Sequence, residues 1–438
     1  MTLESRLLSR LAPWRDAPAW RVALSGGLDS SVLLHLLVQL SRREALPPLS
    51  AIHIHHGLQA AADGWADHCQ RLCDELGVPL TMRRVRVAEG ASLERAARQA
   101  RYDAFAAALA PGEVLLLGQH RDDQAETLLF RLLRGAGVQG LAAMPPSRSL
   151  AAGHLLRPLL DCPRQALSDY AQAHGLRWVE DPSNADLRFS RNYLRHRLLP
   201  LIGERWPAAV ETLARAADHQ REAALLLDEL AQQDLAAAQI PPQTYAWLGL
   251  ASLALVPLRR LSPPRQRNAV RHWLRALTPM PDSEHWAGWQ ALLEAAGDAA
   301  PLWPLKRGVL CRADERLWWL CGDWLQVPPA IDLPVVSGQW LALPGNGRAR
   351  IEGELAAGDW RLGYRQAGAS MRLPGRGQRD LKRLLNERRL PAFVRGRLPI
   401  LLCDGEVRAL ANLPGLDADD AATWRLIWQP PVCDPGLS

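Results

Sequence analysis

Residues 20–40 read WRVALSGGLDSSVLLHLLVQL, which predicts a short apolar strand, a glycine turn and an apolar helix. Glycine at positions 26 and 27 permits backbone conformations that a β-carbon forbids, so successive N–H groups can point into one concavity. The start of the following helix adds a positive potential, and serine hydroxyls add further donors. We therefore predict a phosphate-binding loop formed by Ser25, Gly26, Gly27, Leu28, Asp29, Ser30 and Ser31.

A carboxylate inside this loop limits further which ligands the loop can bind. Asp29 would repel phosphate by itself, and beside bound phosphates it is best explained as a ligand of Mg²⁺. The sequence has no G-x-x-x-x-G-K-[ST] motif, which argues against a Walker-type loop. We expect a nucleotide that is cleaved with release of pyrophosphate. The plainer alternative is a Gly-Gly turn between strand and helix that binds nothing.

Composition and charge limit the class of protein. A chain of 438 residues is too long for one core, which predicts two or three domains, and 48% hydrophobic residues are typical of a globular protein. The net charge of +6 is compatible with an anionic partner. Seven cysteines without a C-x-x-C pair favour free thiols in a reducing cytoplasm. Because there is no signal segment and no run of the ~18 apolar residues that a membrane span needs, we expect a cytoplasmic protein without membrane contact.

Strand and helix patterns alternate over the first half of the chain. Apolar β-type runs at 20–24, 49–55, 80–87 and 113–118 are separated by helical patterns at 32–41, 63–76 and 93–109. This alternation is typical of an α/β fold, in which helices cover both faces of a doubly wound parallel sheet. Ligands of such sheets bind at the carboxyl ends of the strands, where the glycine loop lies.

The pattern changes in the second half of the chain. Ala- and Leu-rich helical periods follow residue 206, and strand-like runs punctuated by Pro and Gly follow residue 327, where Asn346-Gly347 predicts a hairpin turn. Trp318, Trp319 and Trp324 are expected in a core rather than against a cofactor. We predict a catalytic α/β domain over 1–205, a helical middle domain over 206–326 and a small α+β C-terminal domain over 327–438.

A second polar cluster, GQHRDDQAET at 118–127, follows the fourth predicted strand. Asp123 and Glu126 are three residues apart and therefore share one helix face. Two carboxylates beside a nucleotide loop suit a cationic amine or, together with His120, a metal ion, although the spacing matches no zinc signature. The alternative is that Asp122 or Asp123 only caps the helix, where acidic residues are favourable.

Histidines and arginines near other strand ends have two interpretations each. In HIHHGL, at 53–58, strand alternation places His53 and His55 on one face, as a metal pair or as ordinary histidines at the rim. We include His53 among the nucleotide-binding residues. Arg98 and Arg101 recur at helical spacing, which fits a solvated face or contact with nucleotide phosphates equally well.

Two basic segments indicate a polyanion. The loop EDPSN, at 180–184, leads into Arg191 and Arg195, which predicts phosphate contacts or, alternatively, an exposed basic helix. Residues 361–397 contain eleven Arg or Lys against two acidic residues. Solvated charge runs normally mix signs, so this imbalance favours a nucleic-acid surface.

These motifs occur in an order that resembles bacterial tRNA(Ile)-lysidine synthetases, which belong to the N-type ATP-pyrophosphatase, or PP-loop, superfamily. SGGLDSS alone marks the superfamily, whereas DDQAET with a following Arg134-Gly-Ala-Gly137, together with EDPSN and RNYLR at 191–195, is more specific. The resemblance spans nearly the whole chain. The C-terminal segment departs from the family pattern, since RGQRDL at 376–381 has fewer lysines and glycines.

The resemblance implies a two-step reaction. ATP adenylylates the C2 oxygen of the wobble cytidine in the isoleucine tRNA with a CAU anticodon and releases pyrophosphate. The ε-amine of free L-lysine then attacks C2 and expels AMP, which gives lysidine. A homodimer is a further candidate assembly for this chain.

The resemblance also implies residue roles. Asp29 would bind Mg²⁺, Arg98 or Arg101 would offset charge on the α-phosphate, and His120 would bridge ATP and cytidine. Asp123 and Glu126 would hold the amino groups of lysine, while Arg191 and Arg195 would serve AMP or tRNA phosphates. The tRNA contacts of the C-terminal basic segment would come from Arg372, Arg376, Lys382 and Arg383.

Three alternatives remain at this point. A PP-loop tRNA thiolase would use activated sulfur and usually paired cysteines, and Cys69 and Cys73 have the wrong spacing for that. An amidotransferase-type synthetase would need an ammonia source and would not explain the basic C-terminal segment. A non-catalytic tRNA-binding protein would not need Asp29, Asp123 and Glu126 together.

Overall fold

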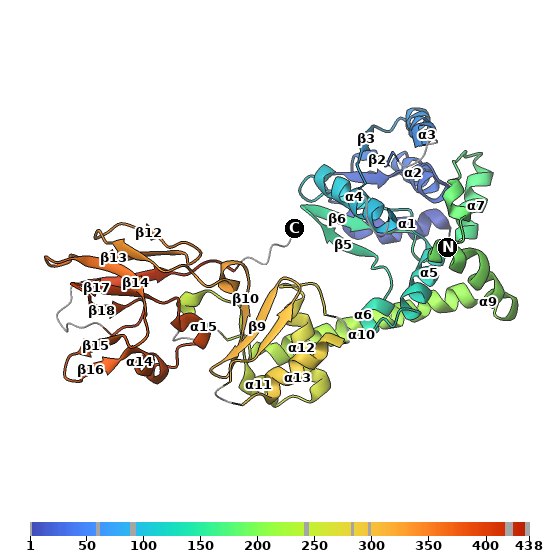
Figure 1. The fold of residues 1–438 in the computed structure, drawn as a ribbon. Helices are drawn as coiled ribbons and strands as arrows, with labels where there is room; N and C mark the ends of the chain where they lie inside the picture. The colour runs from blue at the N-terminus through green and yellow to red at the C-terminus, as the bar shows by residue number, and fades with distance from the viewer. Residues whose placement is uncertain are drawn as a thin grey trace. The chain divides into compact units, whose positions relative to one another are not determined.

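A computed structural model describes residues 2–57, 62–87, 93–240, 245–281, 284–296, 299–416 and 424–433. The chain forms two compact units, Met1–Leu226 and Leu227–Ser438. Figure 1 shows the helices and strands of each unit. The predicted domain boundaries at residues 205 and 326 stay predictions.

Unit 1 is built on a six-stranded sheet with the order β3-β2-β1-β4-β6-β5. Strands β1, β2, β3, β4 and β6 are parallel, and β5 pairs with β6 in the antiparallel sense. This confirms the predicted α/β fold class, whereas the short final hairpin was not predicted. The strands are β1 (Trp20–Ala23), β2 (Leu49–His55), β3 (Leu80–Arg84), β4 (Val114–Leu116), β5 (Ser147–Leu150) and β6 (Gly153–Leu156).

Helices cover both faces of this sheet because the strands are apolar on both sides. Val22 of β1 packs in the cluster formed with α1, α2, α3 and α7, while Ile52 of the adjacent strand β2 packs with Phe105 of α4 on the other face. Fully buried parallel strands of this kind read as continuous apolar runs. The helices are α1 (Leu3–Leu11), α2 (Leu28–Ser41), α3 (Ala62–Leu76), α4 (Leu93–Ala108) and α7 (Arg164–Ala173).

The rest of unit 1 is helical and begins at the carboxyl end of β4. The long helix α10 contains the boundary between the two units. These elements are α5 (Arg121–Leu132), α6 (Val138–Leu141), the 3-10 turn η2 (Pro182–Ala185), α8 (Ser190–Tyr193), the π-turn η3 (Leu194–Leu198), α9 (Leu199–Arg205) and α10 (Ala209–Ala236).

The first part of unit 2 combines helices with a four-stranded antiparallel sheet of order β7-β10-β9-β8. The helices were predicted but the strands were not, since residues 317–320 of the strand RLWWL are all apolar and lack strand alternation. Trp318 and Trp319 are 2% and 1% exposed, which confirms their assignment to a core. The elements are β7 (Ser252–Ala254), α11 (Leu255–Arg259), α12 (Pro263–Leu274), α13 (Ala287–Glu294), β8 (Leu302–Leu305), β9 (Gly308–Ala313) and β10 (Arg316–Leu320).

The C-terminal part of unit 2 has a six-stranded sheet, β11-β14-β17-β18-β15-β16, and a three-stranded sheet, β12-β13-β19. The predicted hairpin turn is present: Gly347 has φ +73° and lies between β12 and β13. The elements are β11 (Asp332–Pro334), β12 (Leu341–Ala342), β13 (Arg348–Glu352), β14 (Trp360–Tyr364), β15 (Ser370–Leu373), β16 (Gly377–Asp380), α14 (Leu381–Glu387), α15 (Ala392–Arg395), β17 (Pro399–Cys403), β18 (Glu406–Leu410) and β19 (Arg425–Gln429).

The cysteines differ from the prediction that all are free thiols. Cys321 and Cys433 form a disulfide with a Cα–Cα distance of 5.3 Å, although 112 residues separate them in the chain. Sequence spacing could not indicate this pair, because the fold alone brings the segment after β10 to the segment after β19. Within the described ranges, no helix has the length and apolar character to cross a bilayer.

Candidate active site

Side chains from other segments pack against the glycine loop after β1. Gly26 has φ +84°, and a β-carbon there would lie 3.0 Å from Val179 Cγ2 and 3.1 Å from Cys69 Sγ. The N–H of Val179 also donates to the Gly26 carbonyl (2.9 Å). Only glycine fits this left-handed, crowded position, so the turn is fixed before any ligand binds.

Serine hydroxyls hold the loop, and two oxygen atoms remain unused. Ser30 Oγ donates to the Gly27 carbonyl (3.0 Å) and lies 3.1 Å from Ser25 Oγ. Asp29 Oδ1 and Ser31 Oγ are buried and have no hydrogen-bond partner among the described residues. A buried oxygen without a partner is costly. These two atoms therefore fit a bound cation and a phosphate, as the sequence predicted for this loop.

Gly118 joins the glycine loop to the second polar cluster. A β-carbon at Gly118 would lie 2.8 Å from the Asp29 carbonyl oxygen and 3.0 Å from the Ser30 nitrogen. Both contacts are with backbone, which cannot move aside without shifting the start of α2. Gly118, two residues after β4, and Asp29, the second residue of α2, therefore approach each other as closely as glycine allows.

Gly118→Ala should displace Asp29 and weaken nucleotide binding. Overpacking of this kind typically costs about 1–3 kcal/mol of folding free energy, so we expect a lower unfolding temperature together with reduced ATP affinity. Calorimetry and thermal unfolding measure both quantities. Gly203→Ala on α9 is the matched control because a β-carbon there meets no atom within 4 Å. Equal behaviour of the two variants would contradict the proposed backbone contact.

His120 lies buried among three carboxylates at the start of α5. Its Nε2 is 3.6 Å from Asp29 Oδ2 and 3.5 Å from Asp123 Oδ2, and its Nδ1 is 3.7 Å from Asp122 Oδ2. Burial alone would lower the pKa of His120, but Asp122, Asp29 and Asp123 outweigh burial and raise the pKa to about 10. His120 is therefore a cation at neutral pH and links the glycine loop to α5 electrostatically.

Stability should consequently decrease at alkaline pH. The pKa of folded His120, about 10, exceeds its ordinary value of 6.5, so its contribution is fully present below pH 6.5 and is lost as pH rises through the folded pKa. We expect the free energy of unfolding to fall by on the order of a few kcal/mol over this window. Urea denaturation at several pH values tests this, with His120→Gln expected to give a flatter profile. Parallel profiles would show that another group titrates.

Two arginines join the carboxylates of α5 to the segment after EDPSN. Arg191 donates to Glu126 Oε2 and Asp123 Oδ1, both at 2.9 Å. Arg195 donates to Glu126 Oε1 (2.6 Å) and Asp123 Oδ1 (3.2 Å). Burial would raise the pKa of Asp123, but the charges of His120 and Arg191 lower it. Glu126 is 1% exposed, whereas the side chains of Arg191 and Arg195 are 33% and 28% exposed, so the network joins two buried carboxylates to two half-buried arginines.

This network changes the expectation for these residues. The sequence predicted carboxylates open to a cationic amine and arginines open to phosphates, whereas the structure pairs the two sets with each other. Asp123 and Glu126 do face the same partners, as their spacing predicted. Since a buried charge is strongly destabilised when it loses its partner, an amine that binds here must compete with a guanidinium group.

Arg98 and Arg101, the two arginines of α4 selected from the sequence, lie in different surroundings. Arg98 is exposed and its guanidinium lies over the Tyr102 ring, 4.9 Å from the centroid. Arg101 is half-buried, and burial together with the charges of Arg98 and Arg191 lowers its pKa. Arg101 is therefore the one that faces the arginine–carboxylate network, and the phosphate role of both stays a prediction.

The histidines after β2 have separate partners. His53 is 4% exposed and its Nδ1–H donates to the Leu24 carbonyl (2.8 Å), directly before the glycine loop. His55 Nε2 lies 3.0 Å from Asp63 Oδ1. They do not form the metal pair that was one interpretation of the sequence. His53 supports the loop from beneath, and its contact with a nucleotide stays a prediction.

The structure identifies two supporting residues that the sequence analysis did not select. Asp122 accepts a hydrogen bond from the Arg164 N–H (3.0 Å) at the start of α7, which is not the helix that the capping alternative concerned. At the start of α5 it is Asp123 whose Oδ2 accepts from a backbone N–H, that of His120 (3.0 Å). Asn192 donates to the carbonyls of Ser183 (2.7 Å) and Asp186 (3.0 Å) and thereby holds the EDPSN loop beside Arg191. The RN pair within RNYLR was the available signal for Asn192.

No group of three or more His, Cys, Asp or Glu within the described ranges could hold a metal ion by itself. Asp29 supplies the unpaired buried oxygen noted above. Mg²⁺ keeps several waters and usually takes one or two carboxylates plus substrate phosphates. The residues therefore fit a magnesium ion that arrives with a nucleotide.

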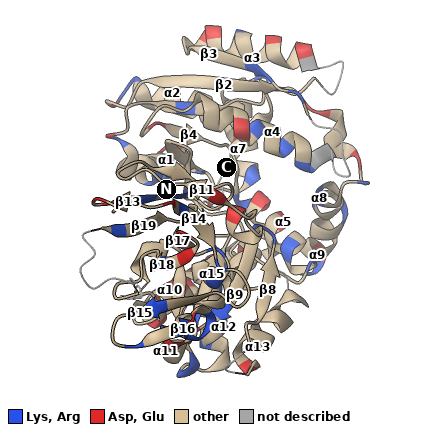
Figure 2. Ribbon diagram, turned by 60° about the vertical axis from the view of Figure 1, so that its left-hand side comes forward, with Lys and Arg blue, Asp and Glu red and all other residues tan. Residues whose placement is uncertain are grey.

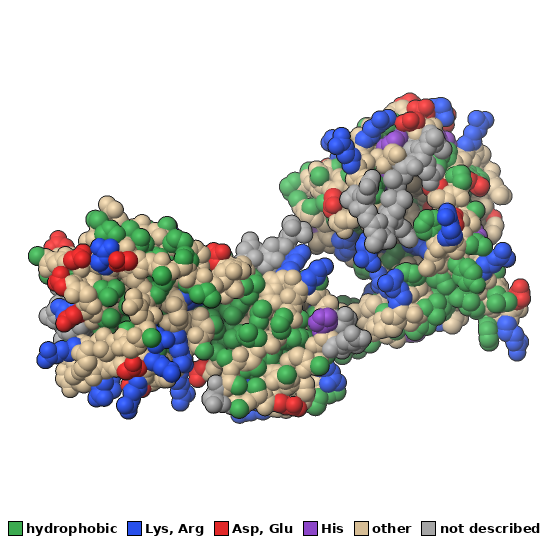
Figure 3. Space-filling model, in the orientation of Figure 1, with side chains coloured by type: hydrophobic (Ala, Val, Ile, Leu, Met, Phe, Trp, Pro, Cys, Tyr) green, Lys and Arg blue, Asp and Glu red, His purple; other side chains and the backbone are tan. Residues whose placement is uncertain are grey.

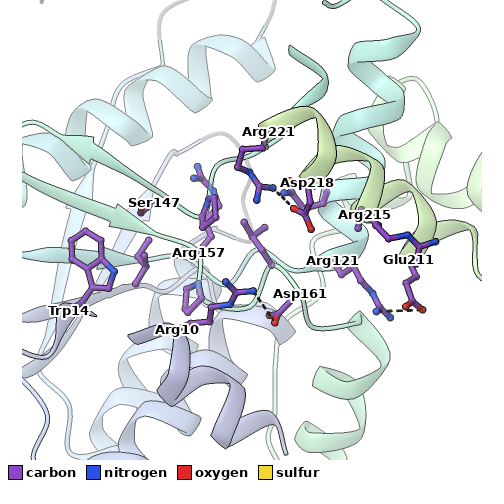
Figure 4. Close-up of a pocket in the computed structure, with 16 residues that line it drawn as sticks. Arg10, Trp14, Arg121, Ser147, Arg157, Asp161, Glu211, Arg215, Asp218 and Arg221 are labelled. Atoms are coloured by element: carbon purple, nitrogen blue, oxygen red, sulfur yellow. Dashed lines mark hydrogen bonds and ion pairs between the residues drawn. The ribbon is translucent and has the colours of Figure 1, made fainter. Parts of the chain in front are cut away.

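A cavity of about 330 Å³ lies beside Arg121 in unit 1, as Figure 4 shows. Its arginines are largely neutralised: Arg10 pairs with Asp161 (3.4 Å), and Arg221 pairs with Asp218 (2.5 Å). Arg157 is 4% exposed and donates to the Pro145 carbonyl (2.8 Å). The arginine-rich lining is thus mainly part of the packing between the sheet edge and α10.

The basic residues predicted in the C-terminal segment gather on one part of unit 2. Figure 2 shows blue stretches of ribbon at β15 and β16, and Figure 3 shows blue side chains in the region where Figure 1 places β15, β16 and α14. Glu387 pairs with Arg376 (3.6 Å) and Arg383 (3.4 Å), whereas Arg372 and Lys382 are exposed and have no ion pair among the described residues. We call this surface the basic hairpin–helix patch, which comprises Arg372, Arg376, Lys382 and Arg383.

Three family models match consecutive parts of the chain. A PP-loop domain matches residues 1–202, a TilS substrate-binding domain matches 253–318, and a TilS substrate C-terminal domain matches 360–428. The first match contains the glycine loop, the His120 cluster and both arginines of the network. The third contains the basic hairpin–helix patch.

Curated relatives match over the full length. A tRNA(Ile)-lysidine synthase of Pseudomonas aeruginosa is 58% identical over 100% of this chain and 99% of its own length. The enzyme of the same name from Escherichia coli O157:H7 is 40% identical over 87% of this chain and 88% of its own. Among solved structures, a U34-tRNA thiolase from Methanococcus maripaludis covers 50% of this chain and 78% of its own with 16% identity and a TM-score of 0.42.

Proposed function

The chain belongs to the tRNA(Ile)-lysidine synthase family and is an ATP-dependent ligase, and from this we propose that it joins free L-lysine to C2 of the wobble cytidine of tRNA(Ile) with a CAU anticodon. The products are lysidine, AMP and pyrophosphate. Because its substrates are tRNA, ATP and lysine, we propose that it acts in the cytoplasm.

In the first step, the C2 oxygen of the cytidine attacks the α-phosphorus of ATP, and pyrophosphate leaves. The glycine loop holds the leaving pyrophosphate through its N–H groups, the start of α2 and Ser31 Oγ. Asp29 Oδ1 would hold Mg²⁺, which supplies charge neutralisation of the phosphates when bound. Cationic His120 and Arg101 face the same region and stabilise the charge that develops in the transition state.

In the second step, the ε-amine of lysine attacks C2 and forms the C2–N bond, the C2–O bond breaks, and AMP leaves with the former C2 oxygen. The amine must lose a proton first, since an ammonium group has no lone pair. Asp123 and Glu126 attract the cationic lysine, and Arg191 or Arg195, once displaced from a carboxylate, can pair with the phosphate of AMP. One set of four side chains thus serves both the incoming amine and the leaving nucleotide.

The network of Asp123, Glu126, Arg191 and Arg195 beside the glycine loop is the observation that supports this proposal most. A nucleotide loop alone fits any PP-loop enzyme, whereas carboxylates at the same strand ends add a site for an amine. The thiolase alternative gains no support from Cys69, because burial raises the pKa of its thiol to about 12 and keeps it protonated.

The test is ATP-to-pyrophosphate turnover by purified protein with isoleucine CAU tRNA and each of the twenty amino acids. We expect turnover and incorporation of lysine alone, with a cytidine adduct detected by mass analysis of the nucleosides. Turnover with a sulfur donor would place the chain with the thiolases. Tight tRNA binding without turnover would support a binding protein instead.

We further propose that the basic hairpin–helix patch contacts tRNA phosphates. Replacing Arg372 and Lys382 together with alanine should weaken tRNA binding and reduce the slope of log K against log salt by about 1–2. Arg43→Ala is the control, since Arg43 pairs with Glu4 in unit 1. An unchanged slope in the double variant would remove the patch from the tRNA interface.

A further inference from the structure

A second cavity of about 480 Å³ opens between the end of α5 and the segment before α8. Its lining combines aromatic, leucine and arginine side chains, among them Phe130, Arg134, Leu187, Arg188, Tyr193 and Leu194. Tyr193 is 53% exposed and Leu187 is 37% exposed. Large apolar side chains left open to solvent beside a cavity mark a binding surface more often than a packing element.

The two arginines of this cavity are in different states. Arg134 lies over the Phe130 ring, 5.1 Å from its centroid, and has no ion pair among the described residues. Arg188 pairs with Asp186 (2.7 Å) while most of its side chain remains exposed. Planar guanidinium groups and aromatic rings are the groups on which unstacked RNA bases stack.

The cavity is lined by the same two segments of chain that carry the arginine–carboxylate network. Phe130 lies four residues after Glu126 on α5, which places it on the same helix face about 6 Å further along the axis. Tyr193 lies between Arg191 and Arg195 in the chain. The same two elements therefore carry the network and the cavity lining: Phe130 lies one turn beyond Glu126, whereas Tyr193, two residues from each arginine, lies on the opposite side of its own helix.

We propose that this cavity binds one unstacked nucleobase of the RNA, directly flanking the cytidine that is modified, by stacking on Tyr193. This rests on the proposed function. A base that enters an active site loses its stacking on its neighbours, which costs free energy. An aromatic surface beside the network would recover part of that loss, and cationic Arg134 would favour the anionic backbone.

The experiment measures binding of an anticodon stem-loop RNA with the CAU sequence by fluorescence anisotropy. Tyr193→Ala should weaken binding by about tenfold, the usual order for loss of one base–aromatic stack. RNAs with an abasic residue on either side of the cytidine provide the second arm. One of these two RNAs should bind the wild type more weakly than the intact RNA does. The same RNA should bind Tyr193→Ala about as the intact RNA does, because the variant already lacks the contact that the abasic residue removes.

Two variants control for folding and for general hydrophobic loss. Tyr193→Phe keeps the ring and should bind as the wild type does. Trp206→Ala removes another exposed aromatic side chain of unit 1, 63% exposed and outside the cavity lining, and should also bind normally. Thermal unfolding of each variant verifies that it folds.

The inference fails if Tyr193→Ala binds RNA as the wild type does, if the effects of the variant and both abasic RNAs are additive, or if the variant alters only the oligomeric state. A wild type that forms no lysidine overturns the proposed function, and this inference with it. Normal lysidine formation with unchanged affinity of Tyr193→Ala overturns this inference alone.

Discussion

Replacing Asp29 with asparagine should reduce pyrophosphate release by about 10²- to 10³-fold, the usual cost of losing one preorganised electrostatic group, and should leave tRNA affinity unchanged. Asp29 Oδ1 is buried without a partner, and Oδ2 lies 3.6 Å from His120. The variant keeps the shape but loses the charge that a cation on the phosphates needs. The loss should therefore fall on the first chemical step.

The measurement is single-turnover pyrophosphate release with saturating tRNA, together with tRNA binding by filter retention. Asp74→Asn on α3 is a matched control, because Asp74 is an exposed carboxylate that bonds only Gln70 among the described residues. A normal rate for Asp29→Asn would remove Asp29 from the mechanism. Equal loss of tRNA binding would indicate a folding defect instead.

Glu126→Ala should have the second large effect, and it should be visible in stability as well as in activity. The substitution removes one of the two carboxylates that Arg191 and Arg195 bond and leaves Asp123 between two half-buried guanidinium groups. Breaking a fully buried pair typically costs about 3–5 kcal/mol, and we expect a loss near the lower end of this range. It also removes a carboxylate proposed for the amine of lysine. We expect a lower urea midpoint and a higher KM for lysine.

Glu126→Gln separates the two effects, since it preserves volume and can still accept one hydrogen bond. Its stability should fall less than that of Glu126→Ala, while the KM for lysine should rise in both. Glu4→Ala, which breaks the surface pair with Arg43, is the control and should cost about 0–1 kcal/mol. If lysine dependence stays normal in both Glu126 variants, the amine-site assignment is wrong.

Local patterns predicted the fold around the glycine loop well. The run at 20–40 contains its own strand, turn and helix signals, and β1 and Gly26 lie where these signals indicated. The helix begins earlier than predicted, at Leu28 instead of residue 32, so Leu28–Ser31 form the first turn of α2 rather than part of a loop. The β5–β6 hairpin was missed because its strands have four residues each and β5 is polar, with Arg148 exposed. Short strands depend on their neighbours in the sheet rather than on their own sequence.

The sequence predicted which residues belong to the candidate site but not which of them bond to each other. Spacing of three residues correctly placed Asp123 and Glu126 on one face of α5. Nothing local indicated that Arg191, 65 residues beyond Glu126, would bond both of them. Such contacts arise from the tertiary fold, as does the Cys321–Cys433 disulfide, so sequence spacing carries no signal for them.

Anyone who grafts the nucleotide loop onto another scaffold would have to transfer more than SGGLDSS. Gly26 is held by Val179 from a segment about 150 residues away in sequence order, and Gly118 leaves no room for a side chain beside Asp29. The smallest transferable unit is therefore three separate pieces of chain with their mutual spacing. A loop transferred alone would keep its sequence but not its conformation.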